Sequence, residues 1–293
     1  MVNSEDGPTI AEVRRLAGEA LRATEFSDKE TVLERLATAA SELGDPAGAA
    51  GARDMGGPEL ADAVDLVDVR RPGRPAAVRL VAPRELARRT WGTESGRVAT
   101  LHALAHIEAN AVNLALDAAH RFAAMPAKYY VDWTRVVLEE FGHFRMLESR
   151  LAEHEIAYGD LGCHDGLWDM AVSTATDARS RMALVPMVFE ARGLDVTPGL
   201  IERFRRHGDD ESADVLEVVL ADEVGHVAVG VEWFRFLCDR DGVDRSIEFE
   251  RLVAEASLKL VPPFNHDARR RAGFDMDDLR RWEMVFTGTQ RNA

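Results

Sequence analysis

Apolar residues recur at spacings of three and four along most of the chain, with charged residues between them. This is the period of amphipathic helices, which bury one stripe and leave the other faces in water. The pattern is longest and most regular in four stretches, which we place at residues 94–124, 127–157, 166–192 and 209–239. Four helices of this length predict an all-α protein built on a four-helix bundle.

Shorter helical patterns flank this predicted bundle. Residues 9–43 carry two of them, with a break near Phe26–Asp28. Glycine, proline and alanine then interrupt the periodicity, which indicates an irregular connection. The C-terminal part carries a helix at 246–260, a break at 261–265 and a final helix at 276–287. We therefore predict four parts: an N-terminal helical hairpin (1–43), an irregular connection that wraps the core (44–93), the bundle (94–240) and a C-terminal helical extension (241–293).

The second stretch carries a glutamate and a histidine inside its apolar stripe. Val137 and Phe144 lie on the same helical face as Glu140. His143 follows Glu140 by three residues and shares that face. The motif Glu-x-x-His is therefore predicted to point into the core.

The other three stretches place acids in the same way. The fourth repeats Glu-x-x-His with Glu223 and His226, and the first and third carry the single inward glutamates Glu108 and Glu190. Buried carboxylates cost several kcal/mol each unless a positive charge compensates them. No Lys or Arg occupies the stripe positions, so two divalent cations would supply that charge. One Glu from each of two helices, with Glu-x-x-His from each of two others, is the donor pattern of ferritin-like di-metal sites.

Spacing supports the first pair of helices better than the second. Glu108 and Glu140 are 32 residues apart, and the Met125-Pro126 break lies almost midway, so an antiparallel hairpin would set both at one height. Glu190 and Glu223 are 33 apart, but the segments GLDVTPG and HGDD interrupt that stretch. The equal-height argument for the second pair rests on analogy with the first.

The six residues together are more specific than either motif alone. With 51 acidic residues and nine histidines in 293 positions, chance gives about 1.6 acids three residues before a histidine. Each histidine alone is better explained as a hydrogen-bonded core residue. Carboxylates with one imidazole per ion suit iron or manganese, whereas zinc sites use cysteine or more histidine. We expect two iron ions, with manganese as the alternative.

Several neighbours of these residues have two interpretations. Asp222 is placed to accept a hydrogen bond from the outer nitrogen of a ligand histidine, or else is a solvated surface acid. Gly142 and Gly225 each precede a motif histidine, which indicates close helix approach or a π-type turn, or is coincidence. The first stretch also carries three histidines without an inward Glu-x-x-His partner, to which we assign no ligand role: His102, His106 and His120.

Charge and composition limit the partners. The net charge of −15 disfavours a nucleic-acid partner without excluding it, since Arg70–Arg74 and Arg269–Arg271 form local basic clusters. No apolar run reaches the roughly 18 residues that span a bilayer, and the first residues lack a secretion signal, so we expect no membrane partner and a cytoplasmic protein. Cys163 and Cys238 form no C-x-x-C pair and are expected to be reduced structural thiols.

The motifs resemble a known family. HALAHIEANAVNLALDAAHRF, VVLEEFGHFRML, HDGLWDMA, MALVPMVFEARGLDVTPG and ADEVGHVAVG are similar to the bacterial family labelled domain of unknown function 455, over about residues 70–275. The residues also resemble the ferritin-like di-iron carboxylate superfamily, which implies a ferritin-like four-helix bundle, and the family distantly resembles the tRNA isopentenyl-adenosine hydroxylases. The resemblance implies an oxidoreductase that activates O2 at a di-iron centre. Ribonucleotide reductase small subunits carry a radical tyrosine seven residues after the first motif's Glu, where this chain has Leu147, so that radical is excluded.

These observations lead to a functional expectation with open alternatives. We expect O2 to be the cosubstrate in the hydroxylation or oxidation of a small molecule or modified nucleoside, with an external electron donor. A ferroxidase or storage protein without organic substrate, and a dimanganese catalase, are the alternatives. Self-association is left open. For the topology, either the third helix begins near Thr176-Asp177 after a crossover segment at 158–175, which we favour, or the helices follow a simple up-and-down order.

Overall fold

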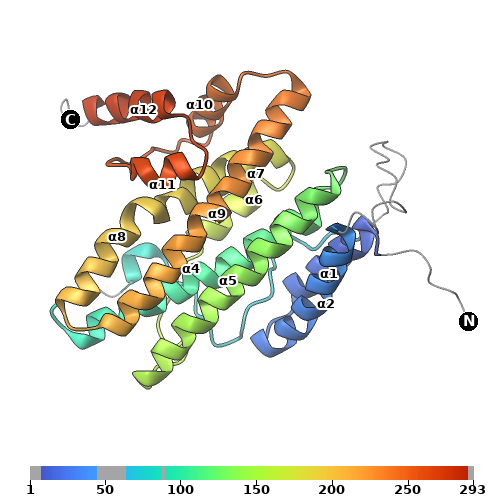
Figure 1. The fold of residues 1–293 in the computed structure, drawn as a ribbon. Helices are drawn as coiled ribbons and strands as arrows, with labels where there is room; N and C mark the ends of the chain where they lie inside the picture. Colours follow the sequence, from blue (N-terminus) through green and yellow to red (C-terminus); the bar gives the residue numbers. More distant parts are fainter. Residues whose placement is uncertain (1–7, 45–63, 87–89, 290–293) are drawn as a thin grey trace, which may run out of the picture. The chain divides into compact units, whose positions relative to one another are not determined.

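The computed structural model describes residues 8–44, 64–86 and 90–289, and these form helices joined by loops (Figure 1). Within these ranges, β pairing is limited to an isolated parallel bridge between Leu80 and Cys163. The predicted all-α class is therefore confirmed. Much of the predicted connection at 44–93 lies outside the described residues. The predicted bounds of the four parts stay predictions.

The described residues divide into two compact units. The first unit takes residues 8–44, 64–86 and 98–175, and the second takes 90–97 and 176–289. The helices of the first unit are α1 (Ile10–Arg22), α2 (Phe26–Gly44), the 3-10 turn η2 (Pro83–Glu85), α4 (Glu94–Arg121, from Val98 onward), α5 (Ala127–Glu153) and α6 (Gly166–Ser173). Those of the second are α7 (Ala178–Leu184), the π-helical turn η3 (Val185–Glu190), α8 (Ala191–Arg206), α9 (Asp210–Asp241), α10 (Arg245–Glu255), α11 (His266–Arg271) and α12 (Met276–Thr289).

In the first unit, α1 and α2 pack against each other and against α5. Two tyrosines at the start of α5 form hydrogen bonds that stabilise the α4–α5 turn. The Tyr129 hydroxyl donates a hydrogen bond to the carbonyl of Ala118 (3.1 Å), and the Tyr130 hydroxyl donates to that of Phe122 (3.0 Å). Both rings are fully buried. The last carbonyls of a helix have no intrahelical donors. The two tyrosines of α5 therefore supply donors to carbonyls at the end of α4.

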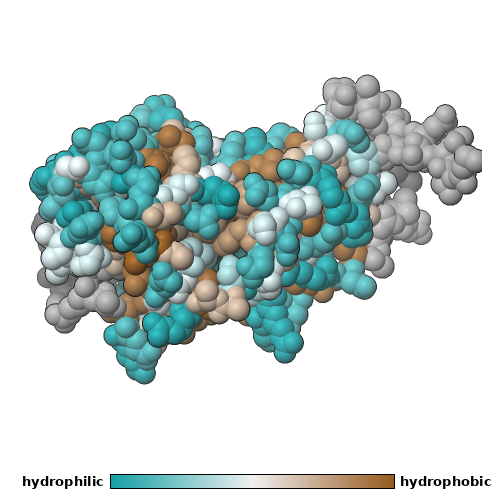
Figure 2. Space-filling model, turned by 90° about the horizontal axis from the view of Figure 1, so that it is seen from below, coloured by the Kyte–Doolittle hydropathy of each residue, from teal (hydrophilic) through white to brown (hydrophobic). Residues whose placement is uncertain are grey.

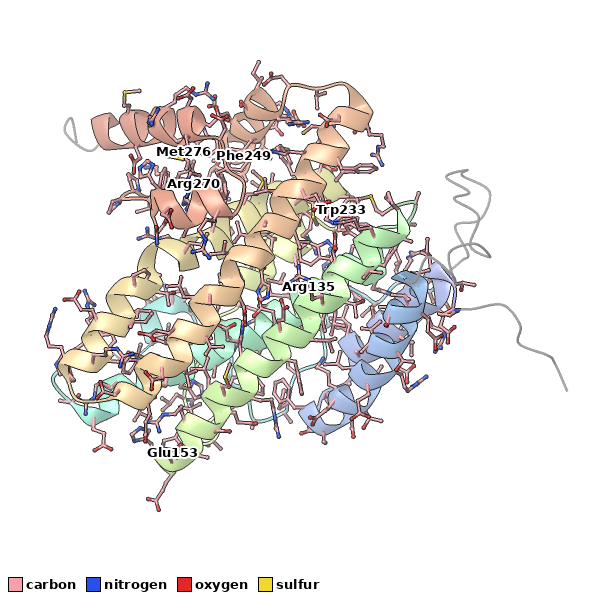
Figure 3. The ribbon with its side chains drawn as sticks, in the orientation of Figure 1. Arg135, Glu153, Trp233, Phe249, Arg270 and Met276 are labelled. Atoms are coloured by element: carbon pink, nitrogen blue, oxygen red, sulfur yellow. The ribbon has the colours of Figure 1, made fainter. Side chains whose placement is uncertain are left out.

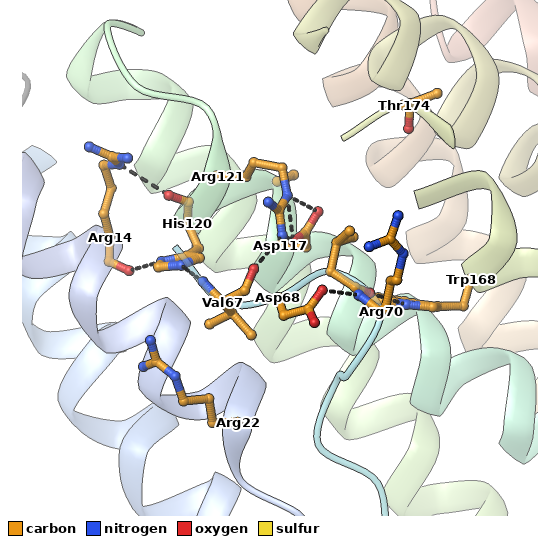
Figure 4. Close-up of polar contacts among 12 residues, drawn as sticks. Arg14, Arg22, Val67, Asp68, Arg70, Asp117, His120, Arg121, Trp168 and Thr174 are labelled. Carbon is orange, nitrogen blue, oxygen red and sulfur yellow. Dashed lines mark hydrogen bonds and ion pairs between the residues drawn. The ribbon is translucent and has the colours of Figure 1, made fainter. Parts of the chain in front are cut away.

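His120 joins α4 to the N-terminal helix (Figure 4). Its Nδ1–H donates to the carbonyl of Arg14 (2.7 Å), and its Nε2 accepts from the Val67 backbone amide (3.0 Å). Gly18 makes room for the ring, because a Cβ there would lie 2.5 Å from Cε1 of His120. Both ring nitrogens are used in hydrogen bonds, so His120 is a structural residue.

His102 and His106 fix the loop that follows α5. Nε2 of His102 accepts from the Gly159 amide (2.9 Å). Nε2 of His106 lies 3.1 Å from the carbonyl of His164 and 3.0 Å from the Asn110 side-chain nitrogen, and its Nδ1 lies 2.9 Å from the Tyr158 hydroxyl. Burial lowers the pKa of His106 to about 4, which keeps the ring neutral. These histidines hold the loop to α4.

In the second unit, the predicted third helix differs from the observed one. The prediction of one helix over 166–192 is wrong: α6 ends at Ser173, and a new helix begins at Ala178. Asp177 caps it, since its carboxylate accepts from the amides of Arg179 (3.0 Å) and Ser180 (3.3 Å). The later start near Thr176-Asp177 is therefore confirmed.

The segment GLDVTPG was expected to interrupt the helix, and this is wrong because it lies inside α8. Pro198 has no N–H, so the carbonyl of Leu194 lacks its donor four residues on. The Asn265 side-chain amide donates to that carbonyl instead (3.1 Å). Asn265 also caps the unpredicted helix α11, accepting from the Ala268 amide (3.2 Å).

The face seen in Figure 2 is mainly hydrophilic, with smaller hydrophobic areas between polar side chains. Searched over the described residues, no helix combines the length and the apolar character that a bilayer crossing requires. Cys163 and Cys238 are buried and form no disulfide.

Candidate metal centre

Glu108, Glu140 and His143 lie together in the core of the first unit, where we call them the α4–α5 cluster. Their exposed fractions are 6%, 1% and 1%. Glu108 comes from α4, and the other two lie one turn apart on α5. The apolar stripes of both helices carry these polar side chains into the interior, as the helical spacing predicts.

One nitrogen of His143 faces both carboxylates. Nδ1 lies 3.4 Å from Oε2 of Glu140 and 3.7 Å from Oε2 of Glu108. Residues from two helices thus converge on one imidazole nitrogen, as the hairpin argument anticipated for Glu108 and Glu140. Nitrogen and carboxylate oxygen are the donor types that iron and manganese accept.

Burial and mutual repulsion make this cluster hold protons. Desolvation, and then the charge of Glu140, raise the pKa of Glu108 well above its usual range. Burial alone would lower the pKa of His143, but hydrogen bonds to Glu108 and Glu140 outweigh it and raise that pKa to about 10. Protonation is how a buried acidic cluster limits its charge, and a bound cation would do the same.

The second unit carries Glu190, Glu223 and His226, which we call the η3–α9 cluster; Glu223 and His226 repeat the geometry seen on α5. Nδ1 of His226 lies 3.3 Å from Oε2 of Glu223, one turn earlier on α9. His226 is fully buried and Glu223 is 9% exposed. The Glu-x-x-His geometry of α5 is therefore repeated on α9.

Glu190 is the last residue of the π-helical turn η3 and is half-buried. The start of α8 runs against Glu223, because a Cβ on Gly193 would lie 3.8 Å from its Oε1. A Cβ on Gly230 would come within 2.3 Å of the Pro186 ring, so α9 approaches η3 closely at a position that admits only glycine. Glu190 and the α9 motif thus lie on neighbouring elements of one unit.

Neither glycine that precedes a motif histidine lies in a π-type turn, and Gly142 is not a point of close helix approach. Nothing lies within 4 Å of a Cβ built on Gly142, so no helix approaches closely there. Both Gly142 and Gly225 lie in regular α-helix, and the π-helical turn is at Val185–Glu190 instead. For Gly142, coincidence was the right interpretation.

Other residues singled out in the sequence have varied surroundings. Asp222 is half-buried beside Glu223, and its proposed contact to a ligand histidine stays a prediction. Phe144 is buried and stacks on Phe26, with ring centroids 4.0 Å apart. Met187 lines a cavity of about 410 Å³ in the second unit, together with Val231, Phe234, Phe249, Phe274 and Trp282.

Two features near Glu190 gave no sequence signal. The contact between Pro186 and Gly230 joins residues far apart in the chain. Asp195 and Arg269 form a buried ion pair (2.7 Å) with side chains only 1% and 3% exposed. Such pairings depend on tertiary packing, which neither the family motif around Asp195 nor the basic run Arg269–Arg271 reveals.

Comparison with known proteins identifies the family. Residues 29–280 match the family described as "Protein of unknown function (DUF455)". The chain is 42% identical over 208 residues to an uncharacterized protein of Haemophilus influenzae, an alignment that covers 68% of this chain and 72% of that protein. No solved structure matches. The resemblance noted in the sequence is confirmed at this level: the chain belongs to the DUF455 family.

Proposed function

We propose that the α4–α5 cluster and the η3–α9 cluster together ligate two iron ions in a ferritin-like bundle, and that the protein is an O2-dependent di-iron oxidoreductase. The observation that carries this proposal is the repeated geometry. In each unit, Nδ1 of a buried histidine faces a carboxylate oxygen of the glutamate one turn earlier, at 3.4 Å for His143 and 3.3 Å for His226.

The residues present fit the proposed ions. Four glutamates and two imidazoles give each ion carboxylate oxygens and one nitrogen, a donor set suited to iron and also to manganese. The raised pKa of Glu108 reflects a buried negative charge that lacks compensation, which a divalent cation provides.

The protein's own residues would orient and shield the ions. Glu108, Glu140, Glu190 and Glu223 would hold them, and His143 and His226 would complete each ligand set. Bound iron would supply the reduction of O2 that oxidises a substrate. Leu147, fully buried one helical turn beyond His143, offers no phenol for a stored radical.

Metal analysis tests this proposal. The full chain purified from its native host, or the metal-free chain reconstituted with Fe(II) without oxygen, should hold two ions per chain. The double variant E140A/H226A should hold none. The matched control E139A/H207A changes an exposed pair of the same residue types and should keep both ions, since Glu139 is paired with Arg135 at the surface. Two ions in E140A/H226A would overturn the site.

A single-turnover experiment separates the oxidoreductase from its alternatives. We expect the diferrous protein to consume O2 stoichiometrically and to form no ferric mineral. Accumulation of many ferric ions per chain would identify a storage protein, and rapid peroxide dismutation by manganese-loaded protein would identify a catalase. In the oxidoreductase, an external reductant should restore the diferrous state. The net charge of −15 favours a small molecule over a nucleic-acid substrate.

A further inference from the structure

The segment 261–271 crosses the start of α8, the helix that begins directly after Glu190. Both belong to the second unit. From this arrangement we infer that Arg269 is a positioning residue: with Asn265 it holds the first turns of α8 and thereby sets the place of Glu190. This inference rests on the proposed metal site.

Arg269 reaches α8 at two points. Its Nη2–H donates to the carbonyl of Ala191 (3.2 Å), the residue next to Glu190. Its guanidinium also binds the Asp195 carboxylate in bidentate fashion, with Nε–Oδ1 at 3.0 Å and Nη2–Oδ2 at 2.7 Å. A bidentate pair fixes orientation as well as distance.

Arg269 is itself held firmly. It is 2% exposed, and its guanidinium carbon lies 4.5 Å from the ring centroid of Phe264 and 5.1 Å from that of Phe274. Contacts of this kind favour a planar guanidinium over an ammonium group. The side chain therefore has little freedom to follow a displacement of α8.

Three further hydrogen bonds join the same two segments. The backbone amide of Asn265 donates to Oδ1 of Asp195 (2.8 Å), and its side chain donates to the carbonyl of Leu194 (3.1 Å). Arg192 donates from Nη1 to the carbonyl of Val261 (2.8 Å). Residues 191–195 are thus bound along their whole length.

The helix needs this support because its own hydrogen bonding is incomplete. Pro186, in η3, and Pro198, in α8, each lack an N–H. In addition, η3 has π-helical instead of α-helical hydrogen bonds. Glu190 lies at the junction of η3 and α8. A helix with defects on both sides of a ligand does not fix that ligand by itself.

Stability alone does not explain the buried ion pair. Replacing such a pair with apolar residues of similar volume is often neutral or stabilising, because two charges lose their hydration. The geometry of Asp195 and Arg269 instead specifies where α8 lies. An apolar pair would fill this buried position equally well, so the charged pair is better explained by its ability to orient α8.

The test compares R269M with R270M in the full chain. Arg270 is exposed on α11 (Figure 3) and pairs with Asp267 at the surface. Titration of metal-free protein with Co(II) and Fe(II) should show one of the two ions binding about 10- to 100-fold more weakly in R269M, the range found when groups that orient ligands are removed. The Co(II) absorption spectrum should change as well, while R270M should match wild type. R269K keeps the positive charge but cannot form the bidentate contact with Asp195, so its affinity for the metal ion should be intermediate.

A destabilised control separates positioning from general loss of stability. W282F removes the hydrogen bond from the Trp282 indole to Glu250 in the same unit (2.8 Å). It should lower the melting temperature and leave the spectrum unchanged. Equal metal affinity in R269M and wild type, or equal weakening in R269M and W282F, would overturn the inference.

Hydrogen exchange tests the same contact without metal. In metal-free R269M, the amides of residues 191–200 should exchange faster than in R270M and W282F. Unchanged exchange would contradict the inference even if metal binding were lost. If the wild-type chain bound no metal, the proposed function would fail, whereas the exchange experiment would still decide whether Arg269 fixes α8.

Discussion

His143 directs Nδ1 at Oε2 of Glu140, 3.4 Å away and one helical turn earlier, with both side chains 2% exposed. An imidazole and a carboxylate in this position share a proton when no cation is present. The proton and a metal ion therefore compete for the same atoms.

Metal binding should release protons. Burial and Glu140 raise the pKa of Glu108, and hydrogen bonds to Glu108 and Glu140 raise that of His143 to about 10, so His143 holds a proton at pH 7 in the metal-free protein. Ligation requires a carboxylate and a neutral imidazole. Affinity should rise with pH between 6 and 8, and calorimetry in buffers of different ionisation enthalpy should show at least one proton released per chain. Heats that do not depend on the buffer would contradict this.

Gly230 and Gly142 should respond oppositely to alanine. G230A places a Cβ 2.3 Å from the Pro186 ring, so η3 must move, at a cost of roughly 1–3 kcal/mol and with weaker metal binding. G142A meets nothing within 4 Å and should stabilise the helix by about 1 kcal/mol with metal binding unchanged. Denaturant unfolding and metal titration of both variants measure this. Similar behaviour of the two would show that the approach of α9 to η3 is not tight.

His120 should matter for stability and not for metal. H120L leaves the Val67 amide without its acceptor, which should cost about 1–3 kcal/mol, and it also removes the second hydrogen bond to the Arg14 carbonyl. The control H207L removes an exposed histidine and should change little. Metal stoichiometry should remain at two ions in H120L. Loss of an ion from a folded H120L protein would assign this histidine to the site.

Lys29 should make the first unit more stable at alkaline pH. Its ammonium nitrogen is buried, bound to the Ala20 carbonyl (2.6 Å) and Oδ1 of Asn113 (3.0 Å), and burial lowers its pKa from 10.5 to about 7. Between these values the unfolded chain binds more protons than the folded chain, so the free energy of unfolding rises with pH from about 7 toward 10.5.

Urea unfolding at pH 7, 8 and 9 measures the effect of Lys29. The rise should be smaller in K29M than in wild type, because methionine cannot titrate. The control K128M changes a lysine whose side chain is 58% exposed and should keep the wild-type slope. Parallel pH profiles for wild type and K29M would show that Lys29 keeps an ordinary pKa.

The sequence predicted the parts of the structure that depend on local periodicity. The helix starts at Glu94, Ala127 and Met276 agree with the predicted ones, and Glu140 and His143 are buried on one face, as their stripe requires. Periodicity fixes which face of a helix is apolar, and this was enough to name the candidate ligands.

What the sequence did not predict depends on distant partners. GLDVTPG has the composition of a loop, and it is helical because Asn265, 71 residues after Leu194, supplies a donor to the carbonyl that Pro198 leaves open. Helix α11 has only six residues, too few for a periodic pattern. The Asp195–Arg269 pair likewise joins residues whose proximity exists only in the folded chain.

The hydrogen bond from Asn265 to Leu194 has a consequence for how the family can vary. Pro198 and Asn265 form a complementary pair, because the asparagine is needed at Leu194 only while residue 198 lacks an N–H. Relatives with another residue at 198 need residue 265 only as the cap of α11, where Ser or Asp serves as well, so the two positions should covary. The same interdependence should make P198A tolerate N265A better than the wild-type chain does, a coupling that a double-mutant cycle measures.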